Sequence, residues 1–428
     1  MPFDFSAYFR THIDDIRSDG RYRTFVEIER LAGRFPQALH HTSEGTREIT
    51  VWCSNDHLGM GQYPTVTEAM HKSIARSGVA AGGSRNISGT NHTHVQLERE
   101  VADLHHKKSG LTFITGYAAN DAVLGVLGRY LPDPVFFSDE QNHASMILGM
   151  RASGAERKIF RHNDPEHLEQ LLAESDPHRP RIVVFESVYS MDGDIAPMPE
   201  ICAVARRHGA LTYADEAHSV GMYGPEGAGM AAALGCAEEI DLMMGTFAKG
   251  YGTAGGYVTG PAPILDAVRS FAPPFIFTLA MPPALAAAAL ASVRHLRESE
   301  NERILLHHRA GLMQDLFRQR RIPMVSTESH IVPVLVGDPH KCKRLADILL
   351  HEHGEYAQPI NAPSVPRGTE RLRINPSPVH SPSTVHRFVD NVDRVWSQLG
   401  LARTRGHDQD APTAVSPIRT GIPQAVSV

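Results

Sequence analysis

The chain has 428 residues, enough for about two domains with substantial cores, and its formal net charge of −6 is mild. No block of like charges indicates nucleic acid or a membrane surface as a partner, so we expect neither. The 4 cysteines are scattered without a Cys-x-x-Cys pair, and the 25 histidines lack metal-ligand spacing, so we expect a cytoplasmic protein without a metal site. A long uncharged stretch, residues 271–293, is interrupted by prolines and cannot form one continuous membrane-spanning helix.

The first 60 residues are expected to form a segment of their own. Residues 6–33 indicate an amphipathic helix and a turn, and residues 48–59 indicate a strand that runs into a polar turn. A helix is predicted from about Pro64 to Arg76. A glycine-rich stretch, residues 80–90, follows it.

From about residue 95, predicted strands and helices alternate. The strands cover residues 111–115, 135–139, 158–160, 181–186 and 210–215, and a helix from about 118 to 130 follows the first of them. Most of these strands are apolar throughout rather than alternating. This pattern is typical of an α/β fold whose mainly parallel sheet is covered by helices on both faces.

The chain is expected to divide after a helix from about Ala284 to Glu298. Residues 61–298 would form the large domain, and residues 299–400 a smaller α+β domain. That smaller domain has predicted helices near 303–320 and 339–353 and predicted strands near 330–336 and 371–374. From Leu401 onward the composition is polar and rich in proline, without periodicity, so residues 401–428 are expected to be a disordered tail.

One lysine stands in unusual surroundings. Lys249 follows an apolar, strand-like run that ends in Gly245-Thr246, and it precedes a run rich in glycine. Burial among small and apolar residues lowers the pKa of a lysine and leaves a neutral amine able to attack an aldehyde. A lysine beside a glycine-rich turn is by itself more often plain loop, so this interpretation depends on other groups in the chain.

A carboxylate upstream provides such a group. Residues 210–215 indicate a buried strand that ends in Asp215, and His218 follows three residues later. A carboxylate at the carboxyl end of a strand is where a pyridinium nitrogen can find its counter-ion. Together with Lys249, the pattern resembles pyridoxal-phosphate (PLP) enzymes of the aspartate-aminotransferase type, fold type I.

Further groups can be assigned around the same cofactor. Gly116 and Tyr117 stand between a strand and a helix, where backbone amides and the helix dipole suit a phosphate, and Thr246 adds a hydroxyl. His218 is expected to reach the ring hydroxyl, and His143 to stack on the ring face. A histidine at a helix N-terminus is an equally ordinary interpretation of His143.

Several long stretches resemble motifs of the α-oxoamine synthases, a family of PLP-dependent acyltransferases. They are Ser54–Gly59, Gly82–Gly89, Asn142–Ser145, Glu186–Asp194, Asp215–His218 and Thr246–Lys249. The similarity runs from about residue 18 to residue 398. Other stretches resemble the branch of this family that makes 5-aminolevulinate: Gly20–Phe25, Ile159–Asp164, Gly221–Gly229 and Pro359–Arg373.

The resemblance implies condensation of glycine with succinyl-CoA, with release of CoA, CO2 and 5-aminolevulinate, in a homodimer with the active site at the subunit interface. It implies that Lys249 forms the internal aldimine and acts as acid and base. Arg373 would hold the glycine carboxylate and Arg23 the succinyl carboxylate, because a guanidinium pairs with a carboxylate through charge-assisted hydrogen bonds.

The complete set of implied site residues is larger. The cofactor residues are Gly116, Tyr117, His143, Glu186, Ser190, Asp215, His218, Thr246, Lys249 and Thr278, and the catalytic ones among them are Lys249, His143, Asp215 and His218. The substrate residues are Arg23, Asn55, Ser84, Asn86, Ile87, Ser138, Ser364 and Arg373.

The chain also departs from the family pattern. Ser84 and Ser364 stand where the family usually has threonine, and His57 stands where it tends to tyrosine. These differences concern substrate choice more than reaction type, so another α-oxoamine synthase with a different acyl-CoA or amino acid stays open. Intact Lys249 and Asp215 argue against a non-catalytic ligand-binding scaffold. Tetrapyrrole synthesis, as for haem, and a secondary metabolite with a five-carbon unit both stay open as the destination of the product.

Overall fold

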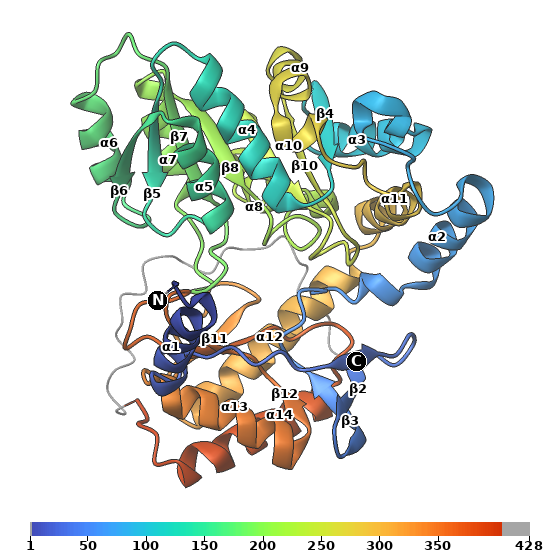
Figure 1. Ribbon diagram of the computed structural model, residues 1–428, viewed down its shortest axis with the longest axis vertical. Coiled ribbons are helices and arrows are strands. Elements are labelled where there is room, and N and C mark those ends of the chain that lie inside the picture. Colours follow the sequence, from blue (N-terminus) through green and yellow to red (C-terminus); the bar gives the residue numbers. More distant parts are fainter. Residues whose placement is uncertain (1, 405–428) are drawn as a thin grey trace, which may run out of the picture. The chain divides into compact units, whose positions relative to one another are not determined.

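The structure, a computed structural model, describes residues 2–404 and divides into two compact units (Figure 1). Unit 1 contains the described residues up to 62, residues 190–194 and residues 304–404. Unit 2 contains residues 63–189 and 195–303. The N-terminal segment that the sequence sets apart therefore shares a unit with residues 304–404. The expected tail falls mostly on residues 405–428, which lie outside the described residues.

A seven-stranded sheet forms the centre of unit 2, with strand order β4-β10-β9-β8-β7-β5-β6. The pairing is parallel throughout except for β10, which is antiparallel to both of its neighbours. The strands are β4 (Ser109–Phe113), β5 (Val135–Asp139), β6 (Glu156–Phe160), β7 (Arg181–Glu186), β8 (Leu211–Asp215), β9 (Leu242–Thr246) and β10 (Gly256–Gly260). The predicted α/β fold with a mainly parallel sheet is thus confirmed.

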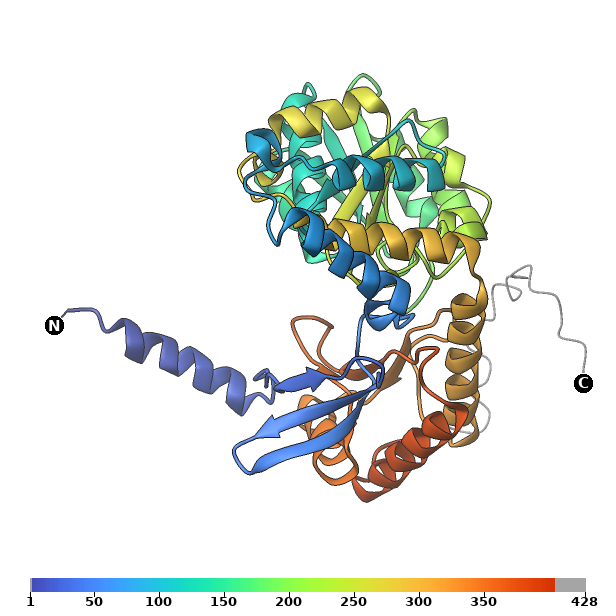
Figure 2. The same ribbon diagram turned by 90° about the vertical axis from the view of Figure 1, so that its right-hand side faces the viewer.

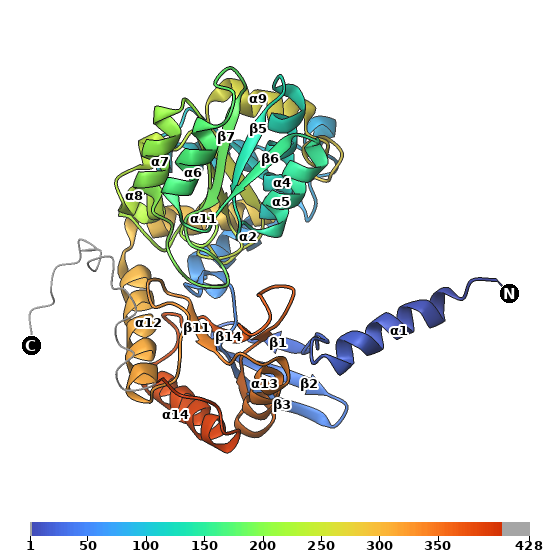
Figure 3. The same ribbon diagram turned by 90° about the vertical axis from the view of Figure 1, so that its left-hand side faces the viewer.

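Helices cover both faces of this sheet (Figure 3). One face carries α4 (Gly116–Tyr130), α5 (Ala144–Ser153), α9 (Ala262–Phe271) and α10 (Pro273–Ile276). The other elements of unit 2 are α2 (Pro64–Ser77), an irregular turn at Arg85–Gly89, α3 (His92–Leu104), α6 (Pro165–Ala173), α7 (Met198–Arg207), α8 (Met230–Ala233), α11 (Pro283–Glu298) and short 3₁₀ turns at Pro225–Gly227 and Ala237–Glu239. Packing against these helices removes both faces of the apolar strands from water, and this burial stabilises the unit.

Unit 1 holds two small sheets, with strand orders β1-β2-β3-β12 and β11-β14-β13. The strands are β1 (Ile28–Arg30), β2 (Gln37–Thr42), β3 (Gly45–Val51), β11 (Val332–Leu335), β12 (Glu355–Tyr356), β13 (Pro359–Ile360) and β14 (Arg371–Ile374). The helices are α1 (Phe5–Ser18), α12 (Asn301–Gln319, in this unit from residue 304), α13 (Pro339–His353) and α14 (Pro382–Gln398). Figure 2 shows β2 and β3 as a hairpin.

The core of unit 1 forms around Trp52. Its ring lies between His380 and Phe388, with ring centroids 4.1 and 4.2 Å away, and its indole N–H donates to Glu355 at 2.7 Å. A buried indole stays stable because its single polar group has an acceptor. Trp52 therefore fixes the start of the polar turn that follows β3.

Candidate functional site

The predicted cofactor residues of unit 2 gather at one edge of its sheet. Gly116 follows β4, Glu186 ends β7, Asp215 ends β8 and Thr246 ends β9. These strands are mutually parallel, so their carboxyl ends share one edge, where α/β proteins bind ligands. The structure thus brings together residues that are far apart in the sequence.

Asp215 lies at the centre of a buried hydrogen-bond network. Asn120 donates from Nδ2 to Asp215 Oδ2 at 2.8 Å, and the backbone N–H of Ala217 donates to Oδ1 at 2.8 Å. Tyr213 donates its hydroxyl to Asn120 Oδ1 at 2.6 Å, and Asn120 also donates to Ser145 Oγ at 2.9 Å. The Asp215 carboxylate is therefore held in one orientation.

Sequence reasoning missed Asn120 and Tyr213 as members of this site. Asn120 lies one turn into α4, the helix that begins at Gly116, and Tyr213 lies on β8 two residues before Asp215. A buried Asn close behind a phosphate-binding helix start was the available signal, because a buried amide needs several partners. Ser145 belonged to a recognised motif, but no role was assigned to it.

His143 stands beside this network at the start of α5. The backbone N–H of Ser145 donates to His143 Nδ1 at 3.2 Å, and Ser145 Oγ lies 2.7 Å from the same nitrogen. Burial lowers the pKa of His143, while Asp215 raises it and Lys249 lowers it further. Since Nδ1 accepts, the neutral ring carries its proton on Nε2.

Glu186 has the most strongly perturbed carboxyl group of this edge. It is buried, and burial together with the nearby Asp215 raises the pKa of Glu186 well above its ordinary range, against the opposing effect of Lys249. Lys249 itself is half-buried, and His218 is buried. Asp215 and Lys249 therefore both lie within electrostatic range of His143 and of Glu186.

The turn that carries Thr246 meets the start of α4. Thr246 Oγ1 donates to Gly255 O at 2.8 Å and accepts from the N–H of Ala248 at 3.2 Å. A Cβ placed on Gly116 would lie 3.4 Å from Thr246 Oγ1 and 2.8 Å from Met244 Cε, so the helix start and Thr246 lie in close contact. The N-terminus of α4 and the Thr246 hydroxyl thus lie side by side. They form an anion cradle when the hydroxyl turns from Gly255 O toward the anion.

Substrate candidates in unit 1 form two pairs. Arg23 Nη2 donates to Ser364 Oγ at 3.0 Å, and Arg373 Nη1 donates to Asn55 Oδ1 at 3.1 Å. Arg373 is buried, and burial lowers the pKa of its guanidinium to about 10. Each predicted carboxylate-binding arginine thus has a neutral polar neighbour from the predicted substrate set.

The remaining site candidates lie on several elements of the two units. Ser190 lies in the 190–194 stretch of unit 1, whereas the other cofactor candidates lie in unit 2. Ser138 is buried at the end of β5 and accepts from Asn142 at 2.8 Å. Thr278 donates its hydroxyl to Pro274 O at 2.8 Å. Asn86 and Ile87 are exposed.

Among residues 2–404 there is no group of three or more His, Cys, Asp or Glu residues arranged to hold a metal ion. In the same part of the chain, no helix combines the length and apolar character that crossing a membrane requires.

Close relatives identify the family. The chain is 53% identical over 400 residues to a 5-aminolevulinate synthase of Rhizobium meliloti (strain 1021), with 94% of this chain and 99% of that protein covered. It is 53% identical over 403 residues to 5-aminolevulinate synthase 2 of Cereibacter sphaeroides, with the same coverage of 94% and 99%. The chain belongs to the 5-aminolevulinate synthases.

The fold places this 5-aminolevulinate synthase chain in a wider group. Residues 47–392 match the family described as aminotransferase class I and II. A solved structure described as SPT with a PLP internal aldimine superposes with a TM-score of 0.85 at 29% identity, covering 93% of this chain and 100% of that chain. The predicted PLP fold type I is thereby confirmed, and PLP is the cofactor of this family.

The residues of this 5-aminolevulinate synthase chain fit PLP. The cradle of Gly116 and Thr246 suits a phosphate, and the oriented Asp215 carboxylate suits a protonated ring nitrogen. Asp215 and Lys249 both lie close enough to His143 to influence its pKa, so a ring-nitrogen partner, an amine and an aromatic ring occur at the same edge of the sheet. These groups of unit 2 are of the kinds that PLP needs.

Proposed function

We propose that the chain condenses glycine with succinyl-CoA and releases CoA, CO2 and 5-aminolevulinate. The observation that carries this proposal is the pair of arginine sites in unit 1, combined with the PLP residues of unit 2. Both proposed substrates carry a carboxylate, and both arginines lie beside a neutral polar group. Among the described residues Arg23 makes no ion pair with a protein carboxylate, so its charge can serve a substrate.

Each proposed catalytic residue would have a distinct role in the reaction. PLP, when bound, supplies an electron sink that stabilises negative charge at the amino-acid Cα. Asp215, oriented by Asn120, holds a proton at the ring nitrogen. Lys249 moves the proton at the glycine Cα, and Arg373 fixes the glycine carboxylate. The remaining cofactor set is Gly116, Tyr117, His143, Glu186, Ser190, His218, Thr246 and Thr278.

The reaction also needs the acyl substrate to be oriented. Arg23 would bind the succinyl carboxylate, with Ser364 holding the guanidinium in place. Asn86 and Ile87 would contact the acyl-CoA from an exposed turn of unit 2. Ser84 caps that turn by accepting from the N–H of Ile87 at 3.3 Å. Asn55 and Ser138 complete the proposed substrate set.

We also propose that the enzyme is a cytoplasmic homodimer with the site at the subunit interface. Large apolar side chains of unit 2 are exposed on neighbouring elements: Ile87 on the 85–89 turn, Tyr117 on α4, and Phe277 and Leu279 directly after α10. Exposed apolar side chains that gather in this way favour a protein interface. The free cysteines, Cys53, Cys202, Cys236 and Cys342, suit a reducing compartment.

Lys249 provides the test. The purified protein should release CoA from succinyl-CoA only with glycine present, and it should form 5-aminolevulinate. Lys249→Ala should keep bound PLP, seen in its visible absorbance, and lose turnover by several orders of magnitude. Lys72→Ala, which removes only a surface ion pair with Glu68 on α2, is the matched control and should leave the rate unchanged. Substantial turnover by Lys249→Ala, or none by the wild type, would contradict the proposal.

A further inference from the structure

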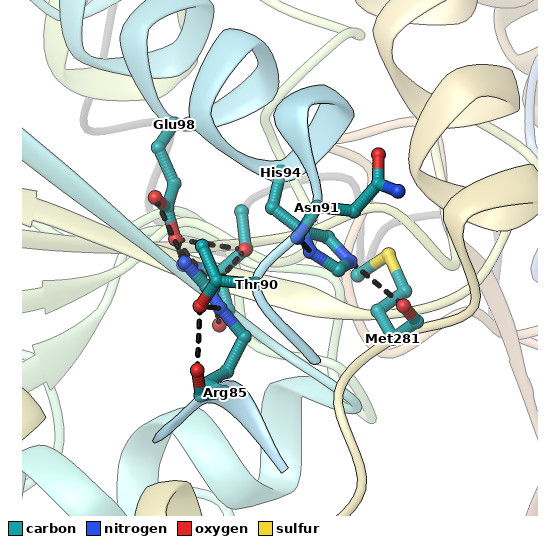
Figure 4. A network of polar contacts seen from close by, with 7 residues as sticks. Arg85, Thr90, Asn91, His94, Glu98 and Met281 are labelled. Atoms are coloured by element: carbon teal, nitrogen blue, oxygen red, sulfur yellow. Dashed lines mark hydrogen bonds and ion pairs between the residues drawn. The ribbon is translucent and has the colours of Figure 1, made fainter. Parts of the chain in front are cut away.

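A network of hydrogen bonds and an ion pair surrounds the base of the exposed turn of unit 2, residues 83–91 (Figure 4). Asn86, Ile87 and Ser88 at its tip are exposed, whereas Gly89 is buried. A Cβ on Gly83 would lie 2.1 Å from the carbonyl oxygen of Ile87, so the turn closes tightly on backbone. Such a turn offers its tip to a ligand only if its base is fixed, because exposed loops otherwise occupy many conformations.

Arg85 fixes one side of the base. Its guanidinium forms a two-pronged ion pair with Glu98 of α3, at 2.7 Å from Nη1 to Oε1 and 3.2 Å from Nη2 to Oε2. Nε donates to Thr90 Oγ1 at 3.2 Å, and Nη1 donates to Thr112 Oγ1 of β4 at 3.1 Å. Glu98 also accepts from the N–H of Thr112 at 3.0 Å.

This ion pair is shielded from solvent. The side chains of Arg85 and Glu98 are only 9% and 13% exposed. A shielded, bidentate guanidinium–carboxylate pair has a defined geometry, unlike a surface pair. The pair therefore ties the turn to α3 and to the edge strand β4 at a fixed distance.

His94 fixes the other side. The N–H of Asn91 donates to His94 Nδ1 at 3.0 Å, and His94 Nε2 lies 2.7 Å from the carbonyl oxygen of Met281. Because Nδ1 accepts, the Nε2–H donates, and burial lowers the pKa of this histidine and keeps it neutral. The N–H of Ala280 donates to Gly83 O at 3.0 Å. Residues 278–281 are thus joined to the turn once directly and once through His94 of α3.

We propose that Arg85, Glu98 and His94 are positioning residues that hold the 83–91 turn and residues 278–281 as one frame and thereby set the affinity for the acyl-CoA. This inference rests on the proposed function, in which Asn86 and Ile87 contact the acyl-CoA. A turn that is already ordered does not lose conformational entropy again on binding, so binding is tighter. None of the three residues needs to touch the substrate.

Two variants of the ion pair test the frame by different routes. Glu98→Gln removes the negative charge but keeps an oxygen that can accept from Arg85. Arg85→Lys keeps the positive charge but loses the two-pronged geometry of the guanidinium. Because lysine still neutralises the shielded carboxylate of Glu98, this second variant is not expected to unfold the protein by leaving a buried charge unpaired. In the PLP-loaded enzyme each should raise KM for succinyl-CoA at least tenfold. The kcat should stay within about threefold and KM for glycine within about twofold, because glycine is proposed to bind Arg373.

Arg297→Gln is the matched control. Arg297 lies on α11 and also joins α3, through ion pairs with Glu100 and Asp103, and a further ion pair joins it to Glu226. Its ion pairs within residues 2–404 do not include the 83–91 turn. This variant should leave both KM values unchanged. An equal rise in the control would mean general destabilisation and would overturn the proposal, as would a fall in kcat with KM unchanged in the two test variants.

Amide hydrogen exchange separates this inference from the proposed function. Residues 83–91 should exchange at least tenfold faster in Glu98→Gln and Arg85→Lys than in the wild type, whatever the substrate is. Unchanged exchange would overturn the frame, and faster exchange with an unchanged KM would overturn its role in binding. His94→Leu should speed exchange in the same residues, and His94→Gln, whose amide can both accept and donate, should restore the wild-type rate. Failure of the proposed function would instead appear as a wild type inactive with glycine and succinyl-CoA.

Discussion

Replacement of Asn120 by alanine should lower the stability of unit 2 and weaken PLP binding, because the Asp215 carboxylate loses the side chain that orients it. The change removes the donor to Asp215 Oδ2, the donor to Ser145 Oγ and the acceptor of the Tyr213 hydroxyl. A hydrogen bond to a charged group contributes about 1.5–3 kcal/mol, and a buried hydroxyl left without an acceptor costs about 1–3 kcal/mol. We therefore expect a loss of about 3–5 kcal/mol in the free energy of unfolding. In a unit of this size that lowers the unfolding midpoint by about 10 °C.

The assay is thermal unfolding with and without PLP, together with titration of the cofactor. Asn120→Ala should bind PLP at least tenfold more weakly, since Asp215 no longer has one orientation; tenfold corresponds to about 1.4 kcal/mol. Tyr213→Phe, which leaves only Asn120 Oδ1 without its donor, should lose about 1–3 kcal/mol of stability. Ser292→Ala, which removes one buried hydrogen bond to Tyr251 O in the same unit, should leave PLP binding unchanged. An Asn120→Ala protein with wild-type stability and cofactor affinity would refute the reasoning.

Three further outcomes are expected. Arg23→Leu should shift relative kcat/KM from succinyl-CoA toward butyryl- or octanoyl-CoA, because an unpaired carboxylate costs about 2–5 kcal/mol; a kept preference for succinyl-CoA would make Arg23 a structural cation. Ser84→Thr should raise the glycine-to-alanine ratio of kcat/KM by tens-fold, since one methyl is worth about 1–3 kcal/mol, and an unchanged ratio would show a neutral substitution. Burial lowers the pKa of His105 to about 3 and of His380 to about 4, from the ordinary 6.5. The unfolded chain therefore binds protons first, and stability measured by urea unfolding should fall as pH drops from 6.5 toward 4, by up to about 1.4 kcal/mol per pH unit and histidine; a slope unchanged in His380→Asn would contradict this.

The sequence predicted the elements that carry strong local signals. The helix expected near 339–353 is α13, Pro339–His353. Asp338 caps its start, because the Asp338 side chain accepts from the N–H of Lys341 at 2.8 Å. Gly354, in the left-handed conformation, ends it. The parallel strands of unit 2 were also predicted, because burial on both faces leaves a largely apolar run. The antiparallel strand β10, Gly256–Gly260, was missed because glycines bound it and indicate a turn. The site candidates came from motifs rather than from periodicity.

Other features depend on contacts between distant residues, which periodicity does not reveal. Strand β2, Gln37–Thr42, contains histidines and a threonine and is stabilised by pairing with β3. The grouping of residues up to 62 with 304–404 comes from such pairings, including that of β12 with β3. The roles of Asn120 and Glu98 depend on packing between a helix and a strand that are separate in the sequence. Asn120 of α4 contacts Asp215 of β8, and Glu98 of α3 contacts Thr112 of β4.

The glycines at the cofactor edge limit how the protein can be altered. A Cβ on Gly256 would lie 2.5 Å from Gly116 Cα. Gly255 has a φ of 112°, which residues with a side chain rarely adopt, and a Cβ there would lie 3.1 Å from Phe113 O. A side chain would therefore displace the start of α4 at Gly256 and strain the backbone at Gly255. A mutational scan would therefore find positions that carry no reactive group to be as intolerant as Lys249. Libraries meant to change the substrate of this enzyme gain most by leaving these positions fixed and varying the tip of the 83–91 turn.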